Sequence, residues 1–177
     1  PTKKLRETYK EIFELSEPIQ PSCVKLIFDK AVASLTLLIA MPILVILKLA
    51  FIVEGILFPE NAGPMFFYYR AVSGGKVIRK YKIRLIKVKC IQQDAAKKHE
   101  WIAYAAEWKK ECRTYVGSFV KKYYLDELPQ FWSVLRGDMS IVGPRPLSEL
   151  HYERDKAQGN VVRGLLRGGL LGFGHIN

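Results

Sequence analysis

The sequence predicts an α+β fold: a small membrane-associated domain with a Pro-broken re-entrant hydrophobic helix, a β-hairpin and several amphipathic helices. Three observations lead there: an apolar run over residues 31–47, an alternating basic and apolar stretch after a glycine turn, and helical periodicity elsewhere. A length of 177 residues suggests one domain, and 49% apolar residues exclude general disorder.

The N-terminal segment, residues 1–21, reads as an amphipathic helix followed by a linker. Leu5, Tyr9, Ile12 and Phe13 recur at helical spacing over residues 2–15, and two prolines follow within residues 17–21. Such a helix could lie on a membrane surface or pack on the domain.

The hydrophobic segment, residues 22–58, is expected to be a re-entrant membrane helix. Residues 31–47 carry no charge, which is close to the minimum length for a membrane span, and Pro42 lies in their middle. Because proline removes a backbone donor and clashes with the preceding turn, two half-helices meeting at Pro42 could enter one leaflet and return. A spanning helix kinked at Pro42 and a buried core helix remain alternatives.

The remaining residues, 59–177, are expected to form the folded domain that follows the hydrophobic segment. Residues 66–69 favour a strand, Ser73-Gly74-Gly75 a turn, and residues 80–85 a half-buried strand with cations on one face. Residues 94–112 read as a helix capped by Asp94, with Trp101 and Trp108 on its apolar face.

Charge and cysteine usage narrow the function classes. The net charge is +11, and residues 65–125 hold all of the excess, with 15 basic and 4 acidic side chains. That concentration favours an anionic partner: nucleic acid, a membrane surface or a phosphorylated substrate; a solvated basic face is the alternative. Cys23, Cys90 and Cys112 form neither a disulfide framework nor a zinc pattern, and we expect all three to be reduced.

The polar signal is densest in residues 121–146. Asp126 is placed to cap a helix that ends at Gly137, and Gly143-Pro144-Arg145-Pro146 is a rigid loop that would hold one guanidinium in place. Arginine binds phosphate through two parallel hydrogen bonds, so Arg145 is a candidate phosphate ligand.

These residues resemble a known family. Residues 125–146, LDELPQFWSVLRGDMSIVGPRP, look like the signature of bacterial sugar transferases, specifically the monotopic polyprenyl-phosphate phosphoglycosyl transferases. Gly63-Pro64-Met65-Phe66-Phe67 and Tyr81-Lys82-Ile83-Arg84 resemble two further family segments, and the apolar run resembles its re-entrant helix. The resemblance covers residues 22–177, with a C-terminal end that is short relative to the family.

The resemblance implies a reaction. In that family an adjacent Asp-Glu pair is catalytic, which assigns Asp126 as nucleophile and Glu127 as its partner, acting as base or metal ligand. The implied reaction transfers a sugar 1-phosphate from a nucleoside-diphosphate sugar, most often a UDP-sugar, to polyprenyl (undecaprenyl) phosphate through a phosphosugar on Asp126. Magnesium is the implied cofactor, held at Asp126. Such enzymes initiate cell-surface glycan assembly at the inner membrane, which implies that residues 59–177 form a cytoplasmic catalytic domain.

The expected partners are the sugar donor, the polyprenyl phosphate and the lipid bilayer, with a homo-oligomer as a further option and no nucleic acid. A non-catalytic membrane adaptor and a basic nucleic-acid-binding module are the competing functions. The residues expected to bind substrate phosphates are Arg145, Lys121, Arg84, Lys82 and Arg70.

Overall fold

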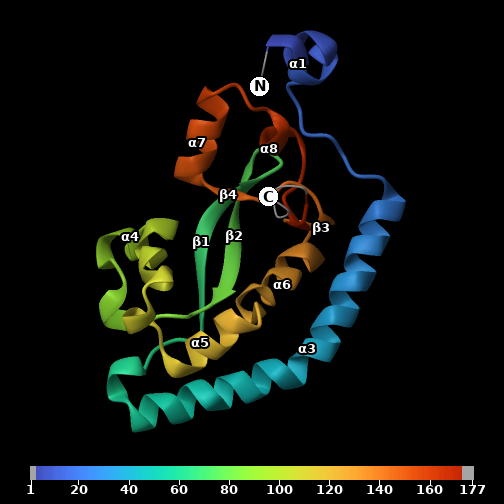
Figure 1. The fold of residues 1–177 in the computed structure, drawn as a ribbon. Coiled ribbons are helices and arrows are strands. Elements are labelled where there is room, and N and C mark those ends of the chain that lie inside the picture. Colours follow the sequence, from blue (N-terminus) through green and yellow to red (C-terminus); the bar gives the residue numbers. More distant parts are fainter. Residues whose placement is uncertain (1–2, 173–177) are drawn as a thin grey trace.

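The computed structural model describes residues 3–172, and Figure 1 shows a central hairpin flanked by helices. The helices are α1 (Lys3–Thr8), α2 (Lys10–Phe13), α3 (Cys23–Leu57), α4 (Gln93–Lys97), α5 (Tyr115–Lys122), α6 (Gln130–Leu135), α7 (Glu149–Ala157) and α8 (Val162–Leu165). Short 3-10 helices are η1 (Pro59–Asn61), η2 (Val88–Cys90), η3 (Trp101–Trp108), η4 (Lys110–Cys112) and η5 (Leu125–Glu127). The strands are β1 (Phe66–Ser73), β2 (Lys76–Ile83), β3 (Ser140–Val142), β4 (Leu147–Ser148) and β5 (Gly169–Leu171). The expected mixture of helix and strand is confirmed.

The predicted hairpin is confirmed as β1 and β2, which pair antiparallel. Phe66 lies opposite Ile83 at one end, and Ser73 lies opposite Lys76 at the turn. Gly74 and Gly75 form the turn with φ of 54° and 72°, the left-handed pair that matches the twist of a two-residue hairpin. Strand β4 adds to the other edge of β1, and β3 pairs in parallel with β5 in a separate two-stranded sheet.

One face of the hairpin is covered by α6, and the first half of α3 packs on the outer side of α6 (Figure 1). The buried side chains packed there are Ala33, Tyr69, Ala71, Ile78, Val134, Met139 and Ile141. A second cluster joins the other end of α3 to the end of β2 and to η3 and α5: Leu47, Phe51, Met65, Ile83, Leu85, Ile86, Ala103, Tyr104 and Val120. Both ends of α3 therefore pack on the same folded body.

Helix α3 is continuous through Pro42, so the expectation of two half-helices broken there is wrong. Proline costs one backbone hydrogen bond and bends the helix, but the flanking turns retain theirs. The bend is visible in Figure 1 where the colour passes through residue 40. Within residues 3–172, α3 alone is long and apolar enough to cross a membrane, and only 17% of its most apolar window is buried.

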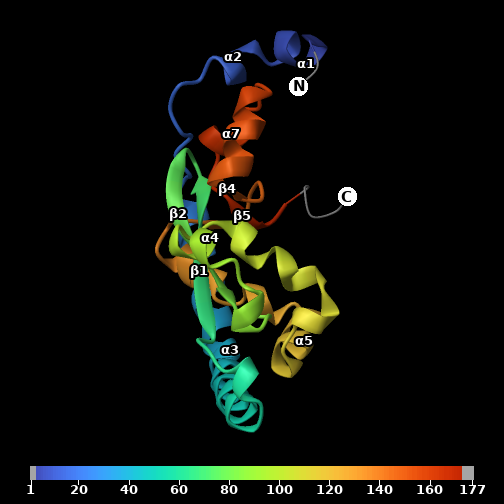
Figure 2. The same ribbon diagram turned by 90° about the vertical axis from the view of Figure 1, so that its left-hand side faces the viewer.

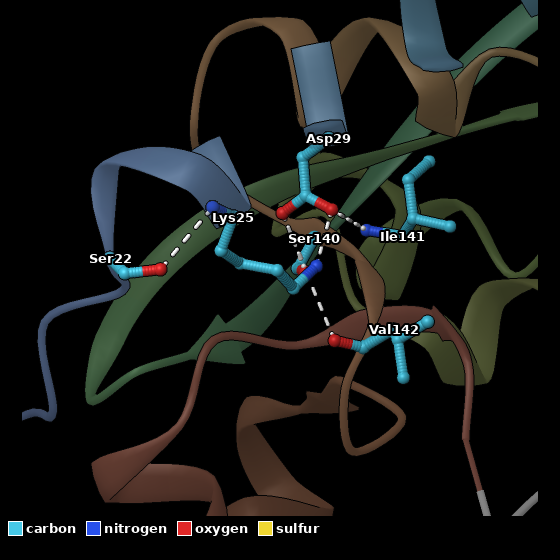
Figure 3. Close-up of polar contacts among 6 residues, drawn as sticks. All are labelled: Ser22, Lys25, Asp29, Ser140, Ile141 and Val142. Carbon is cyan, nitrogen blue, oxygen red and sulfur yellow. Dashed lines mark hydrogen bonds and ion pairs between the residues drawn. The ribbon is translucent and has the colours of Figure 1, made fainter. Parts of the chain in front are cut away.

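A polar cluster fixes the N-terminal end of α3 to β3 (Figure 3). Asp29 is 5% exposed, ion-pairs with Lys25 one turn earlier, and accepts hydrogen bonds from Ser140 Oγ at 2.8 Å and the Ile141 amide at 3.2 Å. Lys25 Nζ also lies 2.6 Å from Ser140 Oγ. Asp29 thus satisfies buried donors of a strand that is 111 residues away in the sequence.

A second carboxylate fixes the C-terminal end of α3. Glu54 is 6% exposed and accepts from the Tyr115 and Val116 amides at 2.6 and 3.1 Å, the first amides of α5. Asn61 Nδ2 donates to Glu54 at 2.8 Å. Because the first amides of a helix have no partner within it, Glu54 satisfies donors that burial would otherwise leave unpaired.

Replacing Asp29 should destabilise the fold. In Asp29→Ala the Ile141 amide and the Ser140 hydroxyl lose a buried acceptor. We therefore expect the free energy of unfolding to fall by about 2–3 kcal/mol. Denaturation in detergent measures this, with Asp94→Ala as control because the Asp94 side chain is fully exposed. Equal stability of the two variants would contradict a role for Asp29 in joining α3 to the domain.

Two sequence expectations between the hairpin and α5 are wrong. Residues 94–112 do not form one helix: α4 ends at Lys97, His99 is left-handed with φ of 56°, and 3-10 helices follow. Nor are all three cysteines reduced, since Cys90 and Cys112 form a disulfide with Cα atoms 5.9 Å apart. Their spacing of 22 residues carries no signal of this contact, which depends on how the intervening helices fold back.

The N-terminal segment also differs from expectation. A single helix over residues 2–15 was expected; the structure has α1 and α2, separated at Tyr9, with exposed Ile12 and Leu15. In Figure 2 both lie at the end of the molecule opposite the lower end of α3. Residue 2, and residues 173–177 of the C-terminal segment that resembles the family, lie outside the described residues.

Candidate active site

The centre of the site is an ion pair between strand β2 and the 3-10 helix η5. Lys82 Nζ lies 2.7 Å from Asp126 Oδ2, and both residues are at most 3% exposed. Tyr124, with φ of 55°, makes a left-handed turn just before η5, and a residue with a Cβ adopts that conformation only at a cost. The turn separates α5 from η5, where Asp126 meets Lys82.

Asp126 does not cap a helix, contrary to the sequence expectation. It belongs to η5, and α6 begins at Gln130 with Pro129 before it. The end at Gly137 is confirmed, since Gly137 is left-handed with φ of 81° directly after Arg136. Lys82 supplies the opposite charge that a buried carboxylate requires.

Glu127 and Arg145 form the second ion pair of the site. Arg145 Nη2 lies 3.1 Å from Glu127 Oε1, and Lys82 Nζ lies 3.9 Å from the same oxygen. Burial opposes ionisation of Glu127, but Lys80, Arg145 and Lys82 together lower the pKa of its carboxyl. Glu127 is therefore held as a carboxylate next to Asp126.

The loop that carries Arg145 is rigid for steric reasons. A Cβ on Gly143 would lie 2.5 Å from the Arg167 carbonyl and 3.0 Å from the Gly169 amide. Only glycine therefore allows these two backbone segments to approach so closely. Arg163 Nε donates to the Arg145 carbonyl at 3.1 Å. The rigid loop expected from the sequence is thus joined to β5 and to α8.

Lys80, Trp101 and Glu107 also belong to the site, and none of the three was assigned to it from the sequence. Lys80 and Lys82 alternate on β2, so they share the face that α6 and Trp101 cover; the predicted row of cations is buried there. The Trp101 ring lies 4.7 Å from Lys82 Nζ. Glu107 of η3 is 2% exposed, and its Oε1 has no hydrogen-bond partner among residues 3–172. The two-residue alternation could have identified Lys80, whereas nothing local marks Glu107.

The carboxyl of Glu107 should make stability depend on pH. Burial raises its pKa to about 7 from 4.5; Asp126 adds to this, while Lys82, Lys121 and Arg113 oppose it. Between these values the unfolded chain releases the proton and the folded chain retains it, so folding stability falls as pH rises. Glu107→Gln removes this dependence on pH. The difference in free energy of unfolding between the variant and wild type should therefore shift in favour of the variant from pH 5 to pH 8, by up to about 3 kcal/mol.

Denaturation curves at several pH values test this expectation. Glu111→Gln is the matched control, because Glu111 is an exposed glutamate four residues further along the chain. A gain in stability that is the same at pH 5 and pH 8 would contradict a buried, protonated Glu107.

The other predicted phosphate-binding residues lie apart from the two ion pairs. Arg84 is buried and donates to the Pro64, Ile86 and Asn61 carbonyls at 2.6–2.8 Å, which leaves it a structural role. Arg70 pairs with Glu149 at 2.5 Å. Lys121 Nζ lies 4.8 Å from the Trp108 ring, on the Glu107 side of the site.

A cleft of about 800 Å³ lies beside β1 and β4 and adjoins the site. Its walls come from residues 98–108 and from the start of α7, and its lining includes Arg70, His99, Trp101, Trp108 and Arg154. Because Trp101 also contacts Lys82, this aromatic and basic cleft shares a wall with the site.

Comparison with known proteins identifies the family. A family model described as bacterial sugar transferase matches residues 20–177. The chain belongs to the bacterial sugar transferase family. The family signature, residues 125–146, supplies both carboxylates and the arginine of the site, and β2 supplies the lysines.

Curated bacterial sugar transferases are similar over most of the chain. The UDP-glucose:undecaprenyl-phosphate glucose-1-phosphate transferase of Escherichia coli (strain K12) is 34% identical over 152 residues, which cover 84% of this chain and 30% of that protein. A putative undecaprenyl-phosphate N-acetylgalactosaminyl 1-phosphate transferase of Bacillus subtilis (strain 168) is 34% identical over 135 residues, 74% of this chain and 66% of that protein.

A third relative is the UDP-N-acetylgalactosamine-undecaprenyl-phosphate N-acetylgalactosaminephosphotransferase of Aeromonas hydrophila. It is 30% identical over 159 residues, 88% of this chain and 35% of that protein. The chain thus spans 30–66% of the length of these three relatives. Their names carry different sugars, so membership in the family does not specify one.

Proposed function

We propose that this chain transfers a sugar 1-phosphate from a nucleoside-diphosphate sugar, with UDP-sugars as the donor class, to undecaprenyl phosphate. The observation that carries the proposal is the adjacent pair Asp126 and Glu127, each held by a cation, in a member of the bacterial sugar transferase family. The named relatives act on undecaprenyl phosphate, which supports the acceptor class. The product would begin the assembly of a cell-surface glycan.

The proposed mechanism has two displacements at one phosphorus. A carboxylate oxygen of Asp126 attacks the phosphorus that bears the sugar; the bond to the nucleoside monophosphate breaks, and that group leaves with the electron pair. A phosphate oxygen of the lipid then attacks the same phosphorus and expels the Asp126 carboxylate. Lys82 and Arg145, each paired with one of the two carboxylates, would stabilise the negative charge that develops on the phosphoryl oxygens.

We propose magnesium as the cofactor. Residues 3–172 contain no group of three metal-binding side chains. The donor set nevertheless fits this ion, which commonly binds one or two carboxylates and takes its other ligands from water and substrate phosphates. Asp126 would hold it, and Glu127 could share it or act as a base. When bound, magnesium would neutralise charge on the substrate phosphates.

The deciding experiment is a donor screen. Purified protein, undecaprenyl phosphate, magnesium and a panel of nucleoside-diphosphate sugars are assayed for release of the nucleoside monophosphate and formation of lipid-linked sugar. We expect one or a few UDP-sugars to react. Folded protein that turns over no donor in the panel would contradict the enzymatic function and favour the adaptor.

We propose that α3 enters one membrane leaflet and returns, with the catalytic part on the cytoplasmic side of the inner membrane. The exposed apolar side chains of α3 and the attachment of both its ends to one body support this arrangement. In sealed vesicles, Cys23, which is free and exposed, and a cysteine introduced at Glu60 should react from the same side. Labelling from opposite sides would show a spanning helix.

Arg145→Lys should lower kcat/KM for the donor about tenfold to a hundredfold. Lysine keeps the charge but loses the planar fork that pairs with a phosphate. The Arg136→Lys variant is the control, since Arg136 pairs with Asp138 and with neither catalytic carboxylate. Wild-type kcat/KM in Arg145→Lys would contradict phosphate binding by Arg145.

A further inference from the structure

Lys80 is a buried lysine at the active site that the mechanism above does not use. It lies two residues before Lys82 on β2 and is 1% exposed. The cross-strand neighbour of Lys80 is Tyr69, whose ring lies 5.9 Å from Lys80 Nζ. The charges that act most strongly on Lys80 are those of Arg145, Glu127, Lys82 and Asp126, so Lys80 lies among the charged groups of the site.

The ammonium of Lys80 has no close anionic partner. Lys82 Nζ has Asp126 at 2.7 Å and Arg145 has Glu127 at 3.1 Å, whereas no hydrogen bond or ion pair joins Lys80 Nζ to another residue of 3–172. Burial, with a smaller contribution from Arg145, lowers the pKa of Lys80 to about 7 despite the opposing effect of Glu127. A buried cation without a partner weakens a fold, so this position costs stability.

The local charge balance has room for an anion. With Lys80 protonated and no metal ion bound, Lys80, Lys82 and Arg145 bring three positive charges and Asp126 and Glu127 two negative charges, a difference of 3 − 2 = +1. Lys121, whose charge acts on Glu107, adds a further positive charge when the Glu107 carboxyl is protonated. A phosphate group would supply the negative charge that Lys80 lacks.

We propose that Lys80 binds the diphosphate of the nucleoside-diphosphate donor, as a second lysine beside Lys82 on the same strand face. The inference rests on the proposed function and adds a substrate-binding residue to it. The two lysines then differ in their partners: Lys82 is paired with the catalytic carboxylate, whereas Lys80 takes the substrate diphosphate as its partner.

The test compares two ligands and two variants. Binding of UDP and of uridine, which lacks phosphate, is measured by calorimetry for wild type, Lys80→Met and the control Lys76→Met. Lys76 is exposed on the same strand face, four residues from Lys80, and its replacement changes the net charge equally. We expect Lys80→Met to bind UDP at least about tenfold more weakly, with uridine binding unchanged, and Lys76→Met to match wild type.

A thermal melt adds a readout that separates a binding role from a structural one. Lys80→Met should melt at the same temperature as wild type or higher, because it removes a buried charge without a partner. A lower melting temperature with UDP binding unchanged would overturn the inference, as would equal losses of UDP and uridine affinity. Lys80→Gln provides the same comparison if the Met variant does not fold. Wild-type protein that binds no UDP would instead overturn the proposed donor class.

Discussion

Asp126→Asn should abolish turnover, with a loss of about a thousandfold or more. An amide oxygen is a far poorer nucleophile than a carboxylate, so the first displacement fails. Wild-type protein mixed with donor alone should release the nucleoside monophosphate in a burst equal to the enzyme concentration and retain a phosphosugar on Asp126. The variant should show neither. A rapid-quench assay of the released nucleoside monophosphate measures the burst, and mass spectrometry of the peptide that contains residue 126 detects the adduct.

Asp138→Asn is the matched control for this experiment. Asp138 lies in the same signature, but it pairs with Arg136 at 3.2 Å in the turn after α6. It should retain the burst and the adduct. Active wild-type enzyme with an unmodified Asp126 peptide and no burst would show direct attack by the lipid phosphate, and the covalent intermediate would be wrong.

Lys82→Met should lower both activity and stability. The change leaves the buried Asp126 carboxylate without its partner, which typically costs about 3–5 kcal/mol. Turnover should fall by about a hundredfold or more, since the cation beside the nucleophile is also lost. Lys80→Met, two residues away, should leave the stability of the fold unchanged or raise it. The same replacement at two lysines of one strand is therefore expected to change folding stability in different directions.

A double variant distinguishes the ion pair from general damage to the strand. In Lys82→Met with Asp126→Asn no carboxylate is left unpaired, so the double variant should be more stable than Lys82→Met alone. Effects that simply add would contradict a direct interaction between the two residues.

The features that follow from local pattern were predicted well. The glycine turn and the alternation after it located β1 and β2, and the apolar run located α3, because these depend on neighbouring residues. The signature placed Asp126, Glu127 and Arg145 in one segment, and the structure brings them together with Lys82.

The features that depend on distant contacts were not predicted. Asp126 has the sequence context of a helix cap, but in the structure it forms a buried ion pair with Lys82, which lies more than forty residues earlier in the sequence. Arg84 belongs to the same basic and apolar alternation as Lys82, but its guanidinium donates hydrogen bonds to three backbone carbonyls of neighbouring segments. The helix expected over residues 94–112 has the right apolar spacing, but a left-handed His99 stacked on Tyr68 interrupts it.

The two carboxylates at the ends of α3 have a consequence for where the reaction takes place. Asp29 and Glu54 lie on either side of the apolar part of the helix, and each bonds to an element next to the site: β3, which leads into the Arg145 loop, and α5, which leads to Asp126. In the proposed arrangement the helix therefore sets the height of Asp126 above the bilayer. An acceptor whose phosphate stays at the headgroup level would then need only lateral diffusion to reach the enzyme, and its chain length would matter little to the encounter.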